Sequence, residues 1–284
     1  MAREERKGRR NKRNKAKNKI TFLISISVVL LVLIFSVYKI VVWVKDNNEI
    51  REQTELINEK VEISEVKDEN KDIEIIEQDK KPEPTNPYWD YIKMNLIDVD
   101  FDNLKEINKY TAGWIQVNGT NVNYPYVQAY TNEHFLYNDF YNKPNEAGWI
   151  FMDYRNNKEV FDKNTIIYGH SRKDTTMFGS LKKILTSDWY NNKDNYIVKL
   201  STDKENMLWQ VFSIYHIKTT SDYLKTNFKS DNEYKIFLDM ISKRSMKDFN
   251  TTVSTKDKVL TLSTCYKTDE RLVLHAKLIK KSKK

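Results

Sequence analysis

The sequence predicts a mainly β domain with peripheral helices, either closed into a barrel or layered as a sandwich. Short runs of β-branched and aromatic residues recur from Gly113 onward, and turn residues separate them. Such runs occupy residues 114–117, 121–127, 148–154, 164–171, 196–201, 207–218, 258–265 and 271–280. A hydrophobic content of 39% and a charged content of 31% fit a soluble domain that carries polar appendages.

Helices are predicted at the start of this domain and between its strands. Two short helices are expected at residues 88–96 and 100–110. Asp100 or Asp102 is a suitable N-cap for the second of them. Another short helix is expected around Phe178–Leu185. The longest is predicted over residues 230–246, where four side chains share one apolar face: Tyr234, Phe237, Leu238 and Ile241.

The net charge of +8 comes from the N-terminus alone. Residues 1–19 hold ten of the 48 basic side chains and two of the 40 acidic ones. The rest of the chain therefore has 38 of each kind. Since the folded part has no net basic charge, the composition argues against a nucleic-acid-binding surface.

A membrane segment is predicted directly after this basic run. Residues from Ile20 to Tyr38 carry no charge, and apolar residues continue to Val44. A helix of this length spans about 30 Å, the thickness of a bilayer core. Positive charge on the N-terminal side predicts a single-pass protein of the cell membrane, with residues 1–19 as a cytoplasmic tail and the C-terminal domain outside.

The competing interpretation of this segment is a cleaved signal peptide. Such a peptide has an apolar core of about 7–15 residues, followed by a cleavage site of the small-x-small type. Residues 37–49, VYKIVVWVKDNNE, offer no such site. We therefore predict an uncleaved signal anchor over residues 20–44.

A charged stalk or linker is predicted between the anchor and the domain. Residues 45–86 are rich in Glu, Lys, Asp, Asn and Ile, and their apolar positions are too irregular for a coiled coil. The prolines of KKPEPTNP, near residue 87, interrupt any helix. A partly helical or disordered linker is expected here, followed by a catalytic domain over residues 87–284.

The single cysteine, Cys265, cannot form an internal disulfide. In an exported domain a lone thiol is either an inert buried residue or a reactive group. Zinc binding is not indicated, because the cysteine and the four histidines show no ligand-pair spacing: His134, His170, His216 and His275. We expect neither a metal nor a cofactor.

The sequence VLTLSTC, residues 259–265, places Cys265 at the end of a predicted strand. Five residues separate it from Arg271, which opens the next strand. An antiparallel pair joined by so short a loop would bring Arg271 close to Cys265. Spacing alone leaves the alternatives open, because free Cys is often a buried apolar residue and an Arg at a strand end is often a surface charge.

His170 ends a third apolar strand, just after Gly169. Alone it would be interpreted as a solvated loop residue. Together, the three side chains suggest nucleophilic catalysis. A thiol with a pKa of about 8.5 is only partly ionised at neutral pH, and a neighbouring histidine can take its proton and later protonate a leaving amine. Arg271 stays charged, so its donors suit an oxyanion or a substrate backbone.

Two motifs resemble the active-site signature of the sortases. They are TLSTC at residues 261–265, followed by Arg271, and IIYGHSRKDTTMFGSL at residues 166–181. EAGWIFMDYRN at residues 146–156 and the extra helices before the first strand are similar to class B of this family. The resemblance covers roughly residues 87–280 and implies an eight-stranded sortase-type β-barrel in a Gram-positive bacterium.

The resemblance also implies an activity, cysteine transpeptidation at a C-terminal sorting signal. It implies Cys265 as nucleophile, His170 as general acid and base, and Arg271 as the group that stabilises substrate and oxyanion. The expected partners are surface proteins that bear the sorting signal and an amine of a peptidoglycan precursor or wall peptide. By motif position, the residues that contact the substrate are expected to be Asn132, Leu136, Thr220, Tyr223, Leu224 and Ser263. Tyr266 follows the cysteine, where some class B members have an acidic residue.

Two other functions remain as alternatives. A papain-like cysteine protease places its cysteine near the mature N-terminus and its histidine downstream, whereas His170 here precedes Cys265. Hydrolysis could still accompany transfer, because water can attack the same thioester. A non-enzymatic adhesin domain on a stalk would leave Cys265 unreactive and dispensable.

Overall fold

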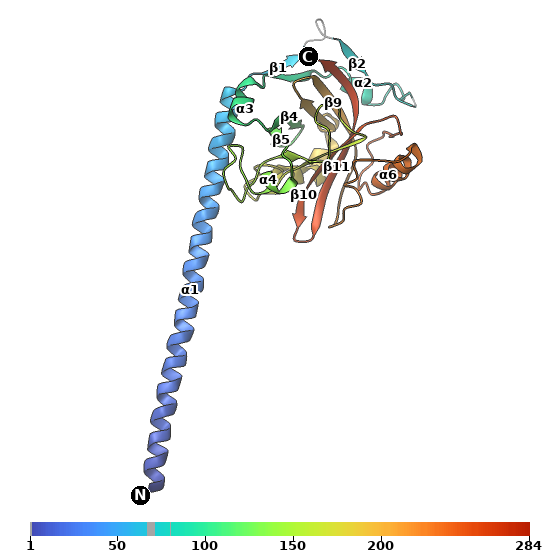
Figure 1. Ribbon diagram of the computed structural model, residues 1–284. Coiled ribbons are helices and arrows are strands. Elements are labelled where there is room, and N and C mark those ends of the chain that lie inside the picture. Colours follow the sequence, from blue (N-terminus) through green and yellow to red (C-terminus); the bar gives the residue numbers. More distant parts are fainter. Residues whose placement is uncertain (1, 67–71, 80) are drawn as a thin grey trace. The chain divides into compact units, whose positions relative to one another are not determined.

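The computed structural model describes residues 2–66, 72–79 and 81–284 (Figure 1). The chain divides into two compact units, Met1–Asn48 and Glu49–Lys284. Helix α1 (Ala2–Lys60) fills the described part of the first unit and continues into the second.

The apolar side chains of the first unit are exposed along α1. They begin at Ile20 and run to Val44. By length and composition, the segment Lys17–Lys60 could cross a membrane. A helix of this length and composition is consistent with a membrane anchor or a signal segment.

The second unit is built around a closed barrel of eight strands, which confirms the predicted fold class. The strands are β4 (Thr111–Val117), β5 (Asn123–Val127), β6 (Phe151–Met152), β7 (Asn164–Tyr168), β8 (Ile197–Ser201), β9 (Glu205–Lys218), β10 (Val259–Lys267) and β11 (Glu270–Lys283). Their order is β10-β7-β6-β5-β4-β8-β9-β11, and pairing of β10 with β11 closes the ring. Each of the eight runs expected from the sequence supplies one of these strands.

Three further strands lie in segments where the sequence indicated none. Strand β1 (Ile63–Val66) pairs with β3 (Leu96–Val99), and β2 (Ile73–Ile75) pairs with the end of β11. β1 and β2 fall inside the segment that we predicted to be a linker. They are only four and three residues long, too short for a recognisable alternation, and their partners come from distant parts of the chain. The domain boundary at residue 87 stays a prediction.

Apart from α1 and α6, the helices are short (Figure 1). They are α2 (Tyr88–Tyr91), α3 (Asp102–Ile107), α4 (Asn132–Leu136), the 3-10 helices η2 (Gly179–Leu185) and η3 (Lys193–Asn195), α5 (Ser187–Asn191) and α6 (Asp231–Lys243). The helix expected over 88–96 stops at Tyr91, because Leu96 already belongs to β3. Asp100 accepts a hydrogen bond from the backbone NH of Asp102 (3.0 Å), although Phe101 holds the N-cap position of α3.

Two apolar clusters hold the second unit together. The larger one includes the barrel interior, where side chains such as Leu262 and Leu274 are fully buried. The smaller one lies under α6, on the outer face of β9, β10 and β11, and includes Tyr215 and Val273. The four side chains predicted for the apolar face of α6 are all buried in this second cluster, so α6 covers one outer side of the barrel.

A matched pair of substitutions tests this placement of the core. Ile167 of β7 is fully buried, whereas Ile236 of α6 is 63% exposed. We expect Ile167→Ala to lower the free energy of unfolding by about 2–5 kcal/mol, because it leaves a cavity. Ile236→Ala should change it by less than about 0.5 kcal/mol. Urea unfolding measures both, and equal effects would contradict the assigned barrel interior.

Candidate active site

Strand β10 places Cys265 between two neighbouring strands that both carry predicted site residues. On one side β10 runs parallel to β7, with Ser263 opposite Tyr168. Two residues further along the chain, Cys265 still belongs to β10, whereas His170 follows the end of β7. Thr264 Oγ1 donates to the Gly169 carbonyl (2.6 Å) and fixes this register at the strand ends. Neighbouring strands lie about 4.8 Å apart, so the pairing brings the thiol and the imidazole into one cleft.

On the other side β10 pairs antiparallel with β11, and Cys265 lies directly opposite Arg271. The predicted hairpin is therefore present. Its register shifts between Cys265 and Lys267, so Tyr266 is the extra residue of a β-bulge. The Tyr266 ring stacks on His216, with ring centroids 4.8 Å apart. Cys265 itself is exposed, which excludes the inert buried thiol of the sequence analysis.

The Arg271 side chain keeps most of its donors available. Among the described residues its guanidinium bonds only the Glu270 carbonyl, through Nη1 (3.2 Å). The other N–H groups can therefore reach a ligand beside Cys265.

The His170 ring is held by one hydrogen bond to the backbone of α4. Its Nε2 lies 2.8 Å from the carbonyl oxygen of Leu136, and a carbonyl can only accept. Nε2 therefore carries the proton, and Nδ1 is the nitrogen that can take up another. Burial lowers the pKa of His170, and the charge of Arg172 lowers it further, although the bond to Leu136 acts in the opposite direction. The imidazole is thus mostly neutral at pH 7.

Two glycines make room for this arrangement. A Cβ on Gly169 would lie 2.8 Å from the Phe178 ring, so the ring packs directly over the backbone before His170. Gly148 has a φ of +56°, and a Cβ there would lie 2.7 Å from the Leu136 carbonyl that holds His170. A side chain at either position would displace a group next to the imidazole.

The three predicted catalytic side chains share one cavity of about 540 Å³. Its lining also includes five of the six residues expected to contact substrate: Leu136, Thr220, Tyr223, Leu224 and Ser263. The Tyr223 and Ser263 hydroxyls are 2.9 Å apart and join the loop before α6 to β10. The remaining lining comes from Phe151, Tyr168, Gly169, Thr219, Ser221 and Thr264.

Asn132, the sixth expected substrate contact, is not among the lining residues. It begins α4, where its Oδ1 accepts from the Tyr154 backbone NH (3.0 Å) and its Nδ2 donates to Asp153 (3.3 Å). Its side chain thus fastens α4 to the loop after β6. Tyr168 and Phe151 were missed as lining residues, although Tyr168 precedes His170 by two positions and so shares its side of β7.

The described residues offer no group of three or more His, Cys, Asp or Glu side chains that could hold a metal ion.

Comparison with known proteins decides which family this site belongs to. Residues 115–279 match the family model of the sortase domain. Sortase B of Staphylococcus aureus is 38% identical over 186 residues, which cover 64% of this chain and 75% of that protein. The chain belongs to the sortase B family. Sortase B of Listeria monocytogenes is 34% identical over 182 residues, covering 63% of this chain and 73% of the relative.

A solved structure of a Staphylococcus aureus sortase B–substrate complex is similar in fold as well. It superposes with a TM-score of 0.59 and 38% identity, and the match covers 63% of this chain and 84% of the other. As a member of the sortase B family, the chain is a cysteine transpeptidase. This assignment excludes both the papain-like and the adhesin alternatives.

A buried polar chain lies on the face of β10 and β11 that also carries Cys265 and Arg271. His275 is fully buried, and its Nδ1 and Nε2 lie 2.8 Å from Thr261 Oγ1 and 2.9 Å from the Tyr215 hydroxyl. Burial, and secondarily the charge of Arg244, lower the pKa of His275 to about 3.

This histidine predicts a pH dependence of stability. Below about pH 6.5 an unfolded chain protonates His275, whereas the folded one keeps it neutral until about pH 3. Stability is therefore lost as the pH falls through this window, by about 1.4 kcal/mol per pH unit from this residue. In urea unfolding measured between about pH 4.5 and 6.5, the free energy of unfolding should depend less steeply on pH for His275→Gln than for the unchanged protein. Equal slopes would contradict the neutral buried imidazole.

Proposed function

We propose that this sortase cleaves a C-terminal sorting motif of surface proteins after a threonine and transfers the acyl group to an amine of a cell-wall peptide. The observation that carries the proposal is that Cys265 of β10, His170 just after β7 and Arg271 of β11 line the same cavity. The family resemblance implies the same three side chains as nucleophile, general acid and base, and stabiliser of the oxyanion.

The first step forms a thioester on Cys265. The thiol gives its proton to Nδ1 of His170, and the sulfur attacks the threonine carbonyl of the bound motif. The C–N bond of the tetrahedral intermediate then breaks. The C-terminal fragment leaves as an amine that takes the proton from His170. A neutral resting histidine, which the lowered pKa of His170 supports, is what this step requires.

The second step releases the product. The acceptor amine attacks the thioester carbonyl and gives a proton to His170, and the C–S bond breaks to regenerate the Cys265 sulfur. Water in place of the amine would give hydrolysis, and the exposure of Cys265 allows that side reaction.

Arg271 is proposed to stabilise the negative charge that develops on the carbonyl oxygen. It lies opposite Cys265 in the hairpin, and its guanidinium has donors left after its bond to the Glu270 carbonyl. Donors aimed at a developing oxyanion typically contribute about 3–4 kcal/mol to transition-state stabilisation. A lysine would keep the charge and lose the planar fork.

The sorting motif is proposed to lie along the cavity. Leu136 and Leu224 offer apolar contact, while Thr220 and Ser263 offer hydroxyls to a peptide backbone. Tyr223 is almost fully buried, with its hydroxyl on Ser263, so it supports the wall.

The proposed location is the outer face of the cell membrane. The helix over residues 20–44 would anchor the chain, and the basic tail of residues 1–19 would hold the N-terminus in the cytoplasm. Residues 45–86 would link the anchor to a catalytic domain of residues 87–284. Both the surface protein and the wall precursor are accessible at that face.

The nucleophile is tested with a peptide that carries a threonine-containing sorting motif. Cys265→Ala should abolish cleavage, and His170→Gln should reduce kcat/KM by at least about 100-fold, because no group remains to accept the thiol proton. His134→Gln is the matched control, since this histidine does not line the cavity. Mass spectrometry with and without an added glycine-peptide amine separates transfer from hydrolysis. Full cleavage by Cys265→Ala would overturn the proposal.

The topology is tested on protoplasts. Protease added outside should digest the domain of residues 87–284. It should spare roughly the first twenty residues, which form the basic tail behind the membrane. An epitope tag at each end reports the two outcomes. Protection of the C-terminal tag in intact protoplasts would contradict the proposed orientation.

A further inference from the structure

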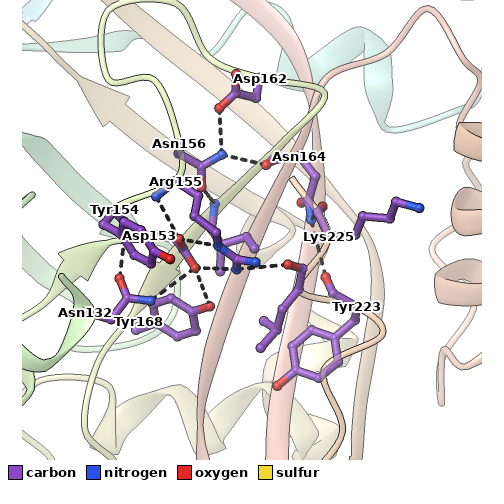
Figure 2. A network of polar contacts seen from close by, with 12 residues as sticks. Asn132, Asp153, Tyr154, Arg155, Asn156, Asp162, Asn164, Tyr168, Tyr223 and Lys225 are labelled. Carbon is purple, nitrogen blue, oxygen red and sulfur yellow. Dashed lines mark hydrogen bonds and ion pairs between the residues drawn. The ribbon is translucent and has the colours of Figure 1, made fainter. Parts of the chain in front are cut away.

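The EAGWIFMDYRN motif contains a buried carboxylate that the proposed chemistry does not use. Asp153 follows β6, and its side chain is fully buried. Its Oδ1 accepts from Nε of Arg155 (2.8 Å) and from the Arg155 backbone NH (3.0 Å). Its Oδ2 accepts from Nη2 of Arg155 (2.7 Å), from the Tyr168 hydroxyl (2.8 Å) and from Asn132 (3.3 Å). Figure 2 shows these donors converging on the one carboxylate.

The charges of this cluster persist at neutral pH. Burial alone would raise the pKa of Asp153, but the hydrogen bonds and charge of Arg155 and the bond from Tyr168 hold it below its ordinary value. The pKa of Tyr168 is raised by burial and by the neighbouring carboxylate, so its hydroxyl stays a donor. A carboxylate with five donors is therefore a fixed anchor point.

Arg155 links Asp153 to the segment between β9 and α6, which lines part of the cavity. Its Nη2 also donates to the backbone carbonyl of Leu224 (3.0 Å). The two flanking carbonyls, of Tyr223 (3.3 Å) and Lys225 (2.9 Å), both accept from Nδ2 of Asn164, the first residue of β7. Three successive carbonyls of this segment are thus held by two side chains of the barrel (Figure 2).

These bonds help to fix the shape of that segment, together with the Tyr223–Ser263 hydrogen bond and the Arg244–Asp222 ion pair. Residues 219–229, between β9 and α6, form neither helix nor strand, so their backbone groups have no regular partners. Five cavity-lining residues belong to this segment: Thr219, Thr220, Ser221, Tyr223 and Leu224. The position of this wall relative to the cysteine follows from the side chains that hold it.

The same carboxylate reaches the other two walls. Tyr168, the last residue of β7, lines the cavity two residues before His170. Asn132 begins α4, and the last residue of that helix, Leu136, bonds the His170 ring. Asp153 therefore joins α4 to β7, which ends two residues before His170, and it reaches the Leu224 carbonyl through Arg155.

We propose that Asp153 and Arg155 are positioning residues that fix the three walls of the cavity relative to one another and so set the width of the peptide groove. The inference rests on the proposed function, in which a sorting-motif peptide lies in this cavity. Neither residue lines the cavity, so neither is expected to touch the reacting atoms.

The geometry requires an arginine at residue 155. A guanidinium can bond both carboxylate oxygens of Asp153 and still direct a second Nη2 hydrogen to the Leu224 carbonyl. The single ammonium of a lysine pairs with the carboxylate as a point charge and cannot hold this fork. Arg155→Lys therefore preserves both charges but loses the hydrogen bond that holds the Leu224 carbonyl.

Three variants of the full chain test the proposal: R155K, D153N and, as a matched control, D239N. Asp239 forms an exposed ion pair with Lys235 on α6 and does not line the groove. Each is followed by amide hydrogen exchange, by kcat/KM for the sorting-motif peptide, and by the rate at which iodoacetamide alkylates Cys265.

In R155K, exchange should rise in residues 219–229, and kcat/KM for the peptide should fall about 10- to 100-fold, because the groove loses its fixed width. Alkylation should change by less than about twofold, since a small reagent needs only the thiolate. In D153N, exchange should rise in α4 as well. D239N should match the unchanged protein in all three measurements.

Unchanged exchange in residues 219–229 of R155K would overturn the proposal, and so would peptide kcat/KM within about twofold of the unchanged protein. An equal loss of alkylation and peptide cleavage would also overturn it, because the effect would then lie in the thiol. If D153N does not fold, R155K decides alone, since it keeps both charges. If the unchanged protein cleaves no sorting-motif peptide, the proposed function fails, and the exchange measurement still decides whether Asp153 and Arg155 hold the walls.

Discussion

The parallel pairing of β7 with β10 is the constraint on which the site depends. It sets Ser263 opposite Tyr168, so that His170 and Cys265 follow at the same end of two adjacent strands. The hydrogen bond from Thr264 to the Gly169 carbonyl holds that end in register (2.6 Å). A slip of one residue would turn the cysteine or the histidine to the opposite face of the sheet and separate them. The barrel therefore serves first to hold β7 and β10 in this register.

The outer face of the barrel carries the chemistry, and its support is polar as well as apolar. The apolar cluster under α6 covers the outer face of β9, β10 and β11, and His275, Thr261 and Tyr215 form a buried hydrogen-bonded chain there. Asp153 and Arg155 form a second polar support, on the side of β7 and α4. Because buried polar groups are costly when unpaired, each support tolerates few arrangements.

Local patterns in the sequence were sufficient for much of this. The alternation in VLTLSTC and RLVLHAKLIK predicted the hairpin, and the structure places Cys265 opposite Arg271. All eight barrel strands were expected, because each has a run of β-forming residues between turns. Strands β1, β2 and β3 were missed, since three or four residues in charged surroundings carry no periodicity and gain their order from distant partners. Asn132 was expected in the groove wall, yet its side chain turns to Asp153.

The sequence by itself determined the elements, the reactive residue types and the family that their motifs resemble. Strand alternation, the lone thiol and the charge-free helix are local properties, because each depends only on residues that are close together in the sequence. Only the tertiary structure decided which residues meet. The pairing of β7 with β10 and the contact of Arg155 with Leu224 join segments far apart in the chain. Such contacts depend on how the barrel closes, and closure is a property of all eight strands together.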